Sequence, residues 1–157
     1  SPDYLTQPLE RKEHQRILTV LNGHVTCTDP YVLLEKGARK YQKNKIDEAQ
    51  IFWEHVLRQP HDNKRATALA WYYLGHAYYE LDQSNNTIYA WEEAAKQDDD
   101  FFTKTDALYN LYVLYSLEEE ERKALQKYEA LKALLFNTRH TETDPFHEAD
   151  ALYYLSG

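Results

Sequence analysis

A pattern of large apolar, small and aromatic residues occurs twice along this chain, at a spacing of 37 residues. Residues 71–78 read WYYLGHAY and residues 108–115 read LYNLYVLY. A recurrence at this period predicts an array of helical repeats, each of them a pair of helices. The similarity continues at identical offsets, with Thr87, Trp91 and Ala94 after the first segment and Ala124, Tyr128 and Leu131 after the second.

These positions resemble the tetratricopeptide repeat (TPR), whose pattern of about 34 residues runs Trp-x-x-Leu-Gly-x-x-Tyr, then Ala-x-x-x-Phe, then Pro. The copy at 71–78 matches the first part, and Trp91 stands for the Phe. In the next copy Tyr112 replaces the Gly, so we expect its two helices to stand further apart. A weaker copy precedes them, with Gly37 and Trp53, and a partial copy begins at Leu152. The resemblance implies an all-α, right-handed solenoid of about three repeats.

Potential helix caps recur at matching places. Asn63 and Asp100 lie eight residues before Trp71 and Leu108, and Asp144 precedes the partial copy by the same distance. Side chains of this kind cap helix N-termini. We therefore divide the chain into an N-terminal segment, 1–29, and repeats at 30–62, 63–99, 100–143 and, in part, 144–157. The third repeat is longer, and an insertion at 136–143 predicts a longer helix or a protruding loop.

The N-terminal segment predicts one amphipathic helix, from Pro8 to Asn22. Ile17, Leu18 and Leu21 form its apolar stripe, and Gly23 is the type of residue that ends a helix. This helix has no second-helix partner in its own segment. It either covers the first repeat or packs into the groove of a second molecule, which would make a homodimer.

Composition narrows the class of protein. Four Gly and five Pro in 157 residues, together with helical periodicity, favour an all-α fold. A net charge of −8 argues against a nucleic-acid partner, which requires clustered Lys and Arg. Cys27 is the single cysteine, so it forms no disulfide within the chain, and we expect it to act as a small apolar residue. No apolar run is long enough to insert into a membrane.

The candidate binding surface follows from a second stripe on the first helix of each repeat. Trp71, Leu74, Gly75 and Tyr78 supply the face that packs on the second helix, whereas a stripe displaced by about 100° has no such partner. In the family that stripe lines the concave surface. Tyr is suited to such a place, because its ring is apolar and its hydroxyl tolerates water. The predicted partner-binding residues are Leu34, Tyr41, Leu69, Tyr72, His76, Tyr79, Glu80, Tyr109, Asn110, Val113 and Tyr153.

A structural interpretation competes with this one, since the same tyrosines could simply seal contacts between successive repeats. Some TPR domains grip a C-terminal carboxylate through Lys and Asn. This chain has Leu34 and Ala38 where the first of those residues would be expected. The groove therefore fits an extended apolar segment or a helix of another protein better.

The sequence contains no pattern that predicts catalysis, a metal or a cofactor. His140, Glu142, Asp144 and His147 are close together, but no pair has the one-turn spacing of a helical zinc motif. The run from Glu118 to Glu121 is interpreted as an acidic first helical turn, which suits the helix dipole. A phosphate loop, a nucleophile elbow and a paired-Cys motif are all missing. We expect a non-enzymatic protein.

The leading hypothesis is an adaptor or chaperone that holds a peptide segment of another protein in its groove. An architectural fragment of a longer solenoid and a regulatory repeat domain of an enzyme are the alternatives. The cytoplasm and the periplasm both remain open as its location, since the chain begins without Met and a signal peptide could have been removed.

Overall fold

The computed structural model describes residues 10–141, with side chains as far as residue 137, and over this range it contains seven helices and no strand. The prediction of an all-α fold is confirmed for this part of the chain. No helix in it is both long and apolar enough to cross a lipid bilayer. The helices are α2 (Arg11–Leu21), α3 (Pro30–Gln42), α4 (Ile46–Arg58), α5 (Lys64–Glu80), α6 (Ser84–Ala95), α7 (Phe101–Leu117) and α8 (Glu121–Thr141).

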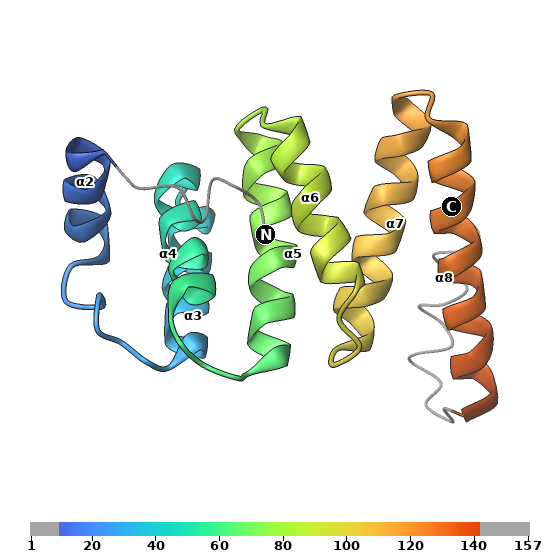
Figure 1. Cartoon of the computed structure of the whole chain (residues 1–157), viewed down its shortest axis with the longest axis horizontal. Helices are drawn as coiled ribbons and strands as arrows, with labels where there is room; N and C mark the ends of the chain where they lie inside the picture. Colours follow the sequence, from blue (N-terminus) through green and yellow to red (C-terminus); the bar gives the residue numbers. More distant parts are fainter. Residues whose placement is uncertain (1–9, 142–157) are drawn as a thin grey trace.

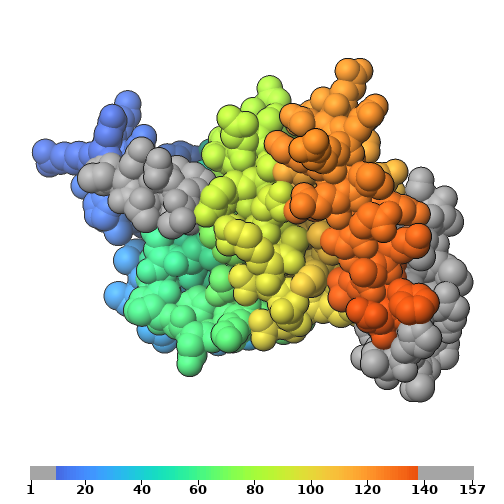
Figure 2. Space-filling model, turned by 45° about the vertical axis from the view of Figure 1, so that its right-hand side comes forward, coloured from blue at the N-terminus to red at the C-terminus, as the bar shows by residue number. Residues whose placement is uncertain are grey.

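Helices α3 to α8 pack in chain order (Figure 1). Short turns join α3 to α4, α5 to α6 and α7 to α8, so that the two helices of each pair run antiparallel. Helix α5 also contacts α3 and α7 directly, which places the first helices of the three pairs next to one another. In the space-filling view the pairs form consecutive bands of one continuous body (Figure 2).

The turns within the three pairs share one backbone conformation. Asn44, Asp82 and Glu119 all have left-handed φ angles, of 61°, 59° and 60°. In each turn the next amide donates a hydrogen bond to the carbonyl five residues before it, at 2.8–2.9 Å, which satisfies the end of the first helix. The conformation therefore recurs at spacings of 38 and 37 residues, in step with the sequence pattern.

A glycine on the first helix receives a tryptophan from the second helix in two of the pairs. A Cβ atom at Gly37 would overlap the indole of Trp53, and one at Gly75 would overlap the indole of Trp91. Both indole N–H groups donate to a main-chain carbonyl of the first helix, at 3.1 and 3.2 Å. The missing side chain thus lets the helices approach closely and gives each buried N–H an acceptor. In the third pair the rings of Tyr112 and Tyr128 lie 5.6 Å apart instead.

Trp71 and Trp91 are both buried, at 8% and 5% exposure. The ring of Trp71 lies 5.7 Å from that of Tyr89 on α6, while Trp91 packs on α5 against Gly75. Each of these tryptophans is therefore buried against the other's helix.

The predicted helix caps in the described range are also confirmed. Asp29 accepts a hydrogen bond from the amide of Tyr31 at 3.0 Å, before a helix that begins with Pro30. Asn63 and Asp100 accept hydrogen bonds from the amide three residues ahead, at 2.9 and 3.1 Å. Asp144 and the partial copy at 144–157 lie outside the described residues.

Tyrosine–glutamate hydrogen bonds, one buried and one partly buried, link successive pairs. Tyr78 of α5 donates to Glu54 of α4 at 2.6 Å, and Tyr115 of α7 donates to Glu92 of α6 at 2.9 Å. The two glutamates each follow a packed tryptophan in the sequence, so this bond recurs together with the glycine–tryptophan contact. Burial raises the pKa of Glu54, although the bond from Tyr78 and the charge of Arg58 act in the opposite direction.

Two predictions near the ends of helices are resolved by the structure. Helix α8 continues to Thr141, through most of the segment where we expected an insertion. The acidic run was interpreted wrongly: α7 ends at Leu117, residues 118–120 form the turn, and only Glu121 lies in the first turn of α8. The left-handed conformation of Glu119 separates the two helices at this point.

Helix α2 packs against α4 of its own chain. Leu21 is buried, and Ile17 and Val20 pack against the same core, whereas Leu18 is 37% exposed. The predicted stripe is therefore wrong at Leu18, because Val20 points towards α4 instead. Gly23 has a φ of 83° and follows the helix end, as predicted.

Candidate functional site

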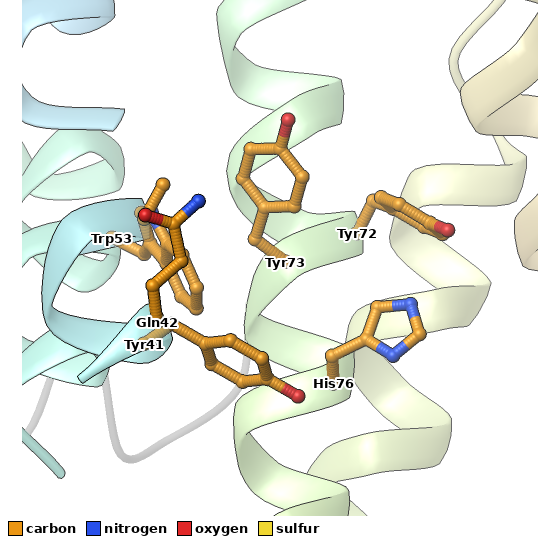
Figure 3. A pocket seen from close by; sticks show the side chains of 7 residues that line it. Tyr41, Gln42, Trp53, Tyr72, Tyr73 and His76 are labelled. Carbon is orange, nitrogen blue, oxygen red and sulfur yellow. The ribbon is translucent and has the colours of Figure 1, made fainter. Parts of the chain in front are cut away.

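A hollow of about 420 Å³ opens between α3 and α5. Figure 3 shows that the ring of Tyr41 extends from the end of α3 towards His76 of α5, with Tyr73 on the same side of α5 as Tyr41. Trp53 of α4 reaches the hollow from behind, because Gly37 carries no side chain that would cover it. The lining residues are Ala38, Tyr41, Gln42, Trp53, Tyr72, Tyr73 and His76.

Aromatic rings in contact form the walls of this first hollow. The centroid of the Trp53 ring lies 5.8 Å from that of Tyr41 and 5.2 Å from that of Tyr73. Tyr72 and Tyr73 are 5.8 Å apart. Rings at these separations hold one another in place, and their exposed faces can take up an apolar side chain.

A second hollow, of about 360 Å³, lies between α5 and α7. Its outer rim carries two well-exposed apolar side chains, Tyr79 at 56% and Leu117 at 73% exposure. The indole of Trp91 contributes to its wall from α6, beside Gly75. The lining residues are His76, Tyr79, Glu80, Trp91, Tyr109, Asn110, Val113, Leu114 and Leu117.

His76 belongs to both hollows and joins them into one surface, which we call the groove. Its imidazole meets the ring of Tyr72 edge-on at 4.8 Å and that of Trp91 at 5.4 Å. Burial lowers the pKa of His76, and the negative charge of Glu80 partly opposes this shift. Burial thus favours the neutral imidazole, which acts as one more aromatic wall.

Tyr72 differs from the other tyrosines of the groove because its hydroxyl is tied to the next pair. It donates a hydrogen bond to Asp106 of α7 at 3.1 Å. Burial and then the neighbouring carboxylate raise the pKa of Tyr72. One of the tyrosines that the sequence analysis assigned to the surface thus also seals the contact between successive first helices.

The structure brings most of the predicted site residues together. Leu34 is a correction: it is only 5% exposed and belongs to the hydrophobic core, because the helices packed around α3 bury it. Leu69 is half-buried against the core and lines neither hollow. Tyr153 lies outside the described residues. The residues that line the groove are Tyr41, Tyr72, His76, Tyr79, Glu80, Tyr109, Asn110 and Val113.

Sequence reasoning missed several lining residues for two different reasons. Leu117 lies four residues after Val113 on the same helical face, so extending the stripe by one turn would have found it. Trp53 and Trp91 belong to the second helices. Their part in the groove depends on the two glycines, which uncover one edge of each indole. The others are Ala38, Gln42, Tyr73 and Leu114.

The described side chains that line the groove are mainly aromatic and apolar. Among the described residues that line it, Glu80 is the one acidic residue, and none is a lysine or an arginine. Within the part of the chain that the structure describes, no three His, Cys, Asp or Glu side chains gather to hold a metal ion. The sequence cluster from His140 to His147 falls beyond the described side chains.

Comparison with known proteins identified no matching family model, no matching curated sequence and no matching solved structure.

Proposed function

We propose that this chain is a TPR-like interaction module that holds a peptide segment of another protein in the groove, as an adaptor or chaperone, without catalysing a reaction. The observation that carries this proposal is the continuity of two aromatic hollows across α3, α5 and α7 through the shared residue His76. Such a surface offers rigid rings at little cost in side-chain entropy, as binding sites for peptides do.

The recurring local geometry supports the solenoid part of the proposal. Each pair repeats the left-handed turn, and two pairs repeat the glycine–tryptophan contact at a spacing of 38 residues. Pairs that repeat in this way stack with their first helices adjacent, and a right-handed stack would give these helices the inner, concave side.

The exposed apolar side chains at the rim of the second hollow support the proposal that the groove binds a peptide. Tyr79 and Leu117 are more than half exposed, so their apolar surface is not used by the fold of the described residues. Apolar side chains gathered around a hollow in this way commonly mark an interaction site.

A library of random peptides displayed on phage and selected on the immobilised chain tests the proposal. Enriched peptides should bind the chain in solution by fluorescence anisotropy. Leu117→Ser and Tyr79→Ser should each weaken binding by about tenfold or more, as the loss of a hot-spot side chain does. The matched control is Leu125→Ser, which removes a leucine with 59% exposure on α8, away from the groove. Peptides that bind all three variants equally would place the binding surface elsewhere and contradict the proposal.

A longer solenoid is the second candidate. Leu125 is exposed on α8, whereas Ile88, at the same place in the preceding pair, packs against the core. A further helix pair would cover Leu125. A full reading frame that encodes additional copies would favour this candidate.

A further inference from the structure

The C-terminal turns of α3, α5 and α7 form one edge of the groove, and the charge along this edge changes from positive at α3 to negative at α5 and α7. The three first helices run parallel, so that their C-terminal turns lie at one end of the molecule. The turn after α3 carries Lys43 and Lys45, whereas the end of α5 carries Glu80 and Asp82 and the turn after α7 begins with Glu118. The C-terminal ends of α5 and α7 add the partial negative charge of their helix dipoles.

Glu80 lies at the junction of the two hollows. It lines the second hollow, and its negative charge also acts on two residues of the first. Burial and then the charge of Glu80 raise the pKa of Tyr41, and the same charge opposes the fall in the pKa of His76. Among residues 10–137, whose side chains the structure describes, no lysine, arginine or histidine forms an ion pair with Glu80.

We propose that the segment held in the groove carries a lysine or arginine that pairs with Glu80, between two apolar side chains that occupy the hollows. This inference rests on the proposed function and adds the chemistry of the partner. A cation at this point completes an ion pair beside aromatic rings, which also attract cations through their faces.

The same negative charges disfavour a segment that carries an acidic side chain between the two hollows. An acidic side chain placed between the hollows would face Glu80, the ends of α5 and α7 and a chain with a net charge of −8. Specificity is a difference between affinities, and repulsion of the wrong partner contributes to it as much as attraction of the right one. Charge complementarity also speeds association at low salt.

Synthetic peptides of matched design test this inference directly. Each peptide has two large apolar residues at a varied separation and one central residue, either Lys, Arg, Gln or Glu, with Ser and Gly elsewhere. Their affinities are measured by fluorescence anisotropy for the unchanged chain, for Glu80→Gln and Glu80→Lys, and for Leu117→Ser and Tyr79→Ser. The control is Glu13→Lys, which makes the same change of net charge at an exposed position on α2, away from the groove.

We expect the Lys and Arg peptides to bind most tightly and to lose about twofold to fivefold in affinity with Glu80→Gln, the range for an exposed ion pair. Glu80→Lys should reverse the preference in favour of the Glu peptides, and Glu13→Lys should leave it unchanged. The preference should also shrink at high salt.

Two results would overturn the inference, and they have different consequences for the proposed function. Affinities that do not depend on the central residue, but fall with Leu117→Ser, would leave the groove as the binding site and remove the role of Glu80. Binding that does not respond to Leu117→Ser or Tyr79→Ser would remove the groove itself. A preference for Glu peptides in the unchanged chain, or no binding by any peptide, would also overturn the inference.

Discussion

The indole of Trp91 occupies the space that a side chain at position 75 would need, and Gly75, which has no side chain, makes room for it. The same relationship joins Trp53 to Gly37 one pair earlier. It fixes how closely two helices pack, and it places one edge of each indole in the wall of the groove. A single residue type on one helix thus decides both the spacing of a pair and the shape of the candidate site.

Replacing this glycine should therefore destabilise the protein. Gly75→Ala gains about 1 kcal/mol of helix propensity but forces the buried indole to move, and overpacking of this kind costs about 1–3 kcal/mol and sometimes more. We expect a net loss of up to about 2 kcal/mol in the free energy of unfolding, measured with urea. The control is the double variant Gly75→Ala with Trp91→Phe, which should cost less than the sum of the single changes because the smaller ring makes room. Strict additivity would contradict the contact.

The tyrosines of the groove should differ in how much their hydroxyl groups contribute to the stability of the fold. Tyr72→Phe removes the hydroxyl that donates to Asp106 and should lower the free energy of unfolding by about 1–2 kcal/mol. Tyr79→Phe removes the hydroxyl of a ring that is 56% exposed and should change it by less than about 0.5 kcal/mol. Urea unfolding of the two variants measures the difference. Equal costs would mean that the bond to Asp106 does not tie α5 to α7.

The buried carboxyl of Glu54 should make stability depend on pH. Its pKa is raised in the folded state, chiefly by burial, so the folded chain binds this proton more tightly than the unfolded chain does. The contribution of Glu54 to wild-type stability should therefore fall as pH rises from the ordinary Glu value of 4.5 through the raised pKa. Glu54→Gln lacks this titration, so its stability relative to wild type should improve over the same range.

Urea unfolding at a series of pH values from 4 to 8 measures this difference, since the contributions of all other groups cancel between the two proteins. Tyr78→Phe provides a second comparison. It removes a hydrogen bond that lowers the pKa of Glu54, so it should move the transition to higher pH. A difference between Glu54→Gln and wild type that stays constant with pH would contradict the raised pKa.

The turn before α8 should become more stable when its left-handed residue is replaced by glycine. Glu119 has a φ of 60°, a conformation that costs a residue with a Cβ about 1–2 kcal/mol and costs glycine nothing. Glycine also makes the unfolded chain more flexible, which reduces this gain in stability. We expect Glu119→Gly to raise the melting temperature even so. The neighbouring variant Glu118→Gly is the control. Residue 118 has a φ of −89°, so glycine there should lower the melting temperature.

The sequence by itself determined the local structure of this chain. The caps at Asn63 and Asp100 and the ends of α5 and α7 depend on residues within a few positions of one another, because helices form and end through local hydrogen bonds. The periodic placement of Gly75 and Trp91 was likewise readable, since helical spacing puts large and small residues on known faces.

Only the tertiary structure decided which parts of the remaining face are open. Leu34 and Tyr72 occupy matching places in successive repeats, yet Leu34 is buried in the core and Asp106 of α7 holds the hydroxyl of Tyr72. Exposure depends on how close a neighbouring helix lies, and that distance is set by residues far away in the sequence. The union of the two hollows at His76 has the same origin, because it requires three helices to lie side by side at distances that no single helix specifies.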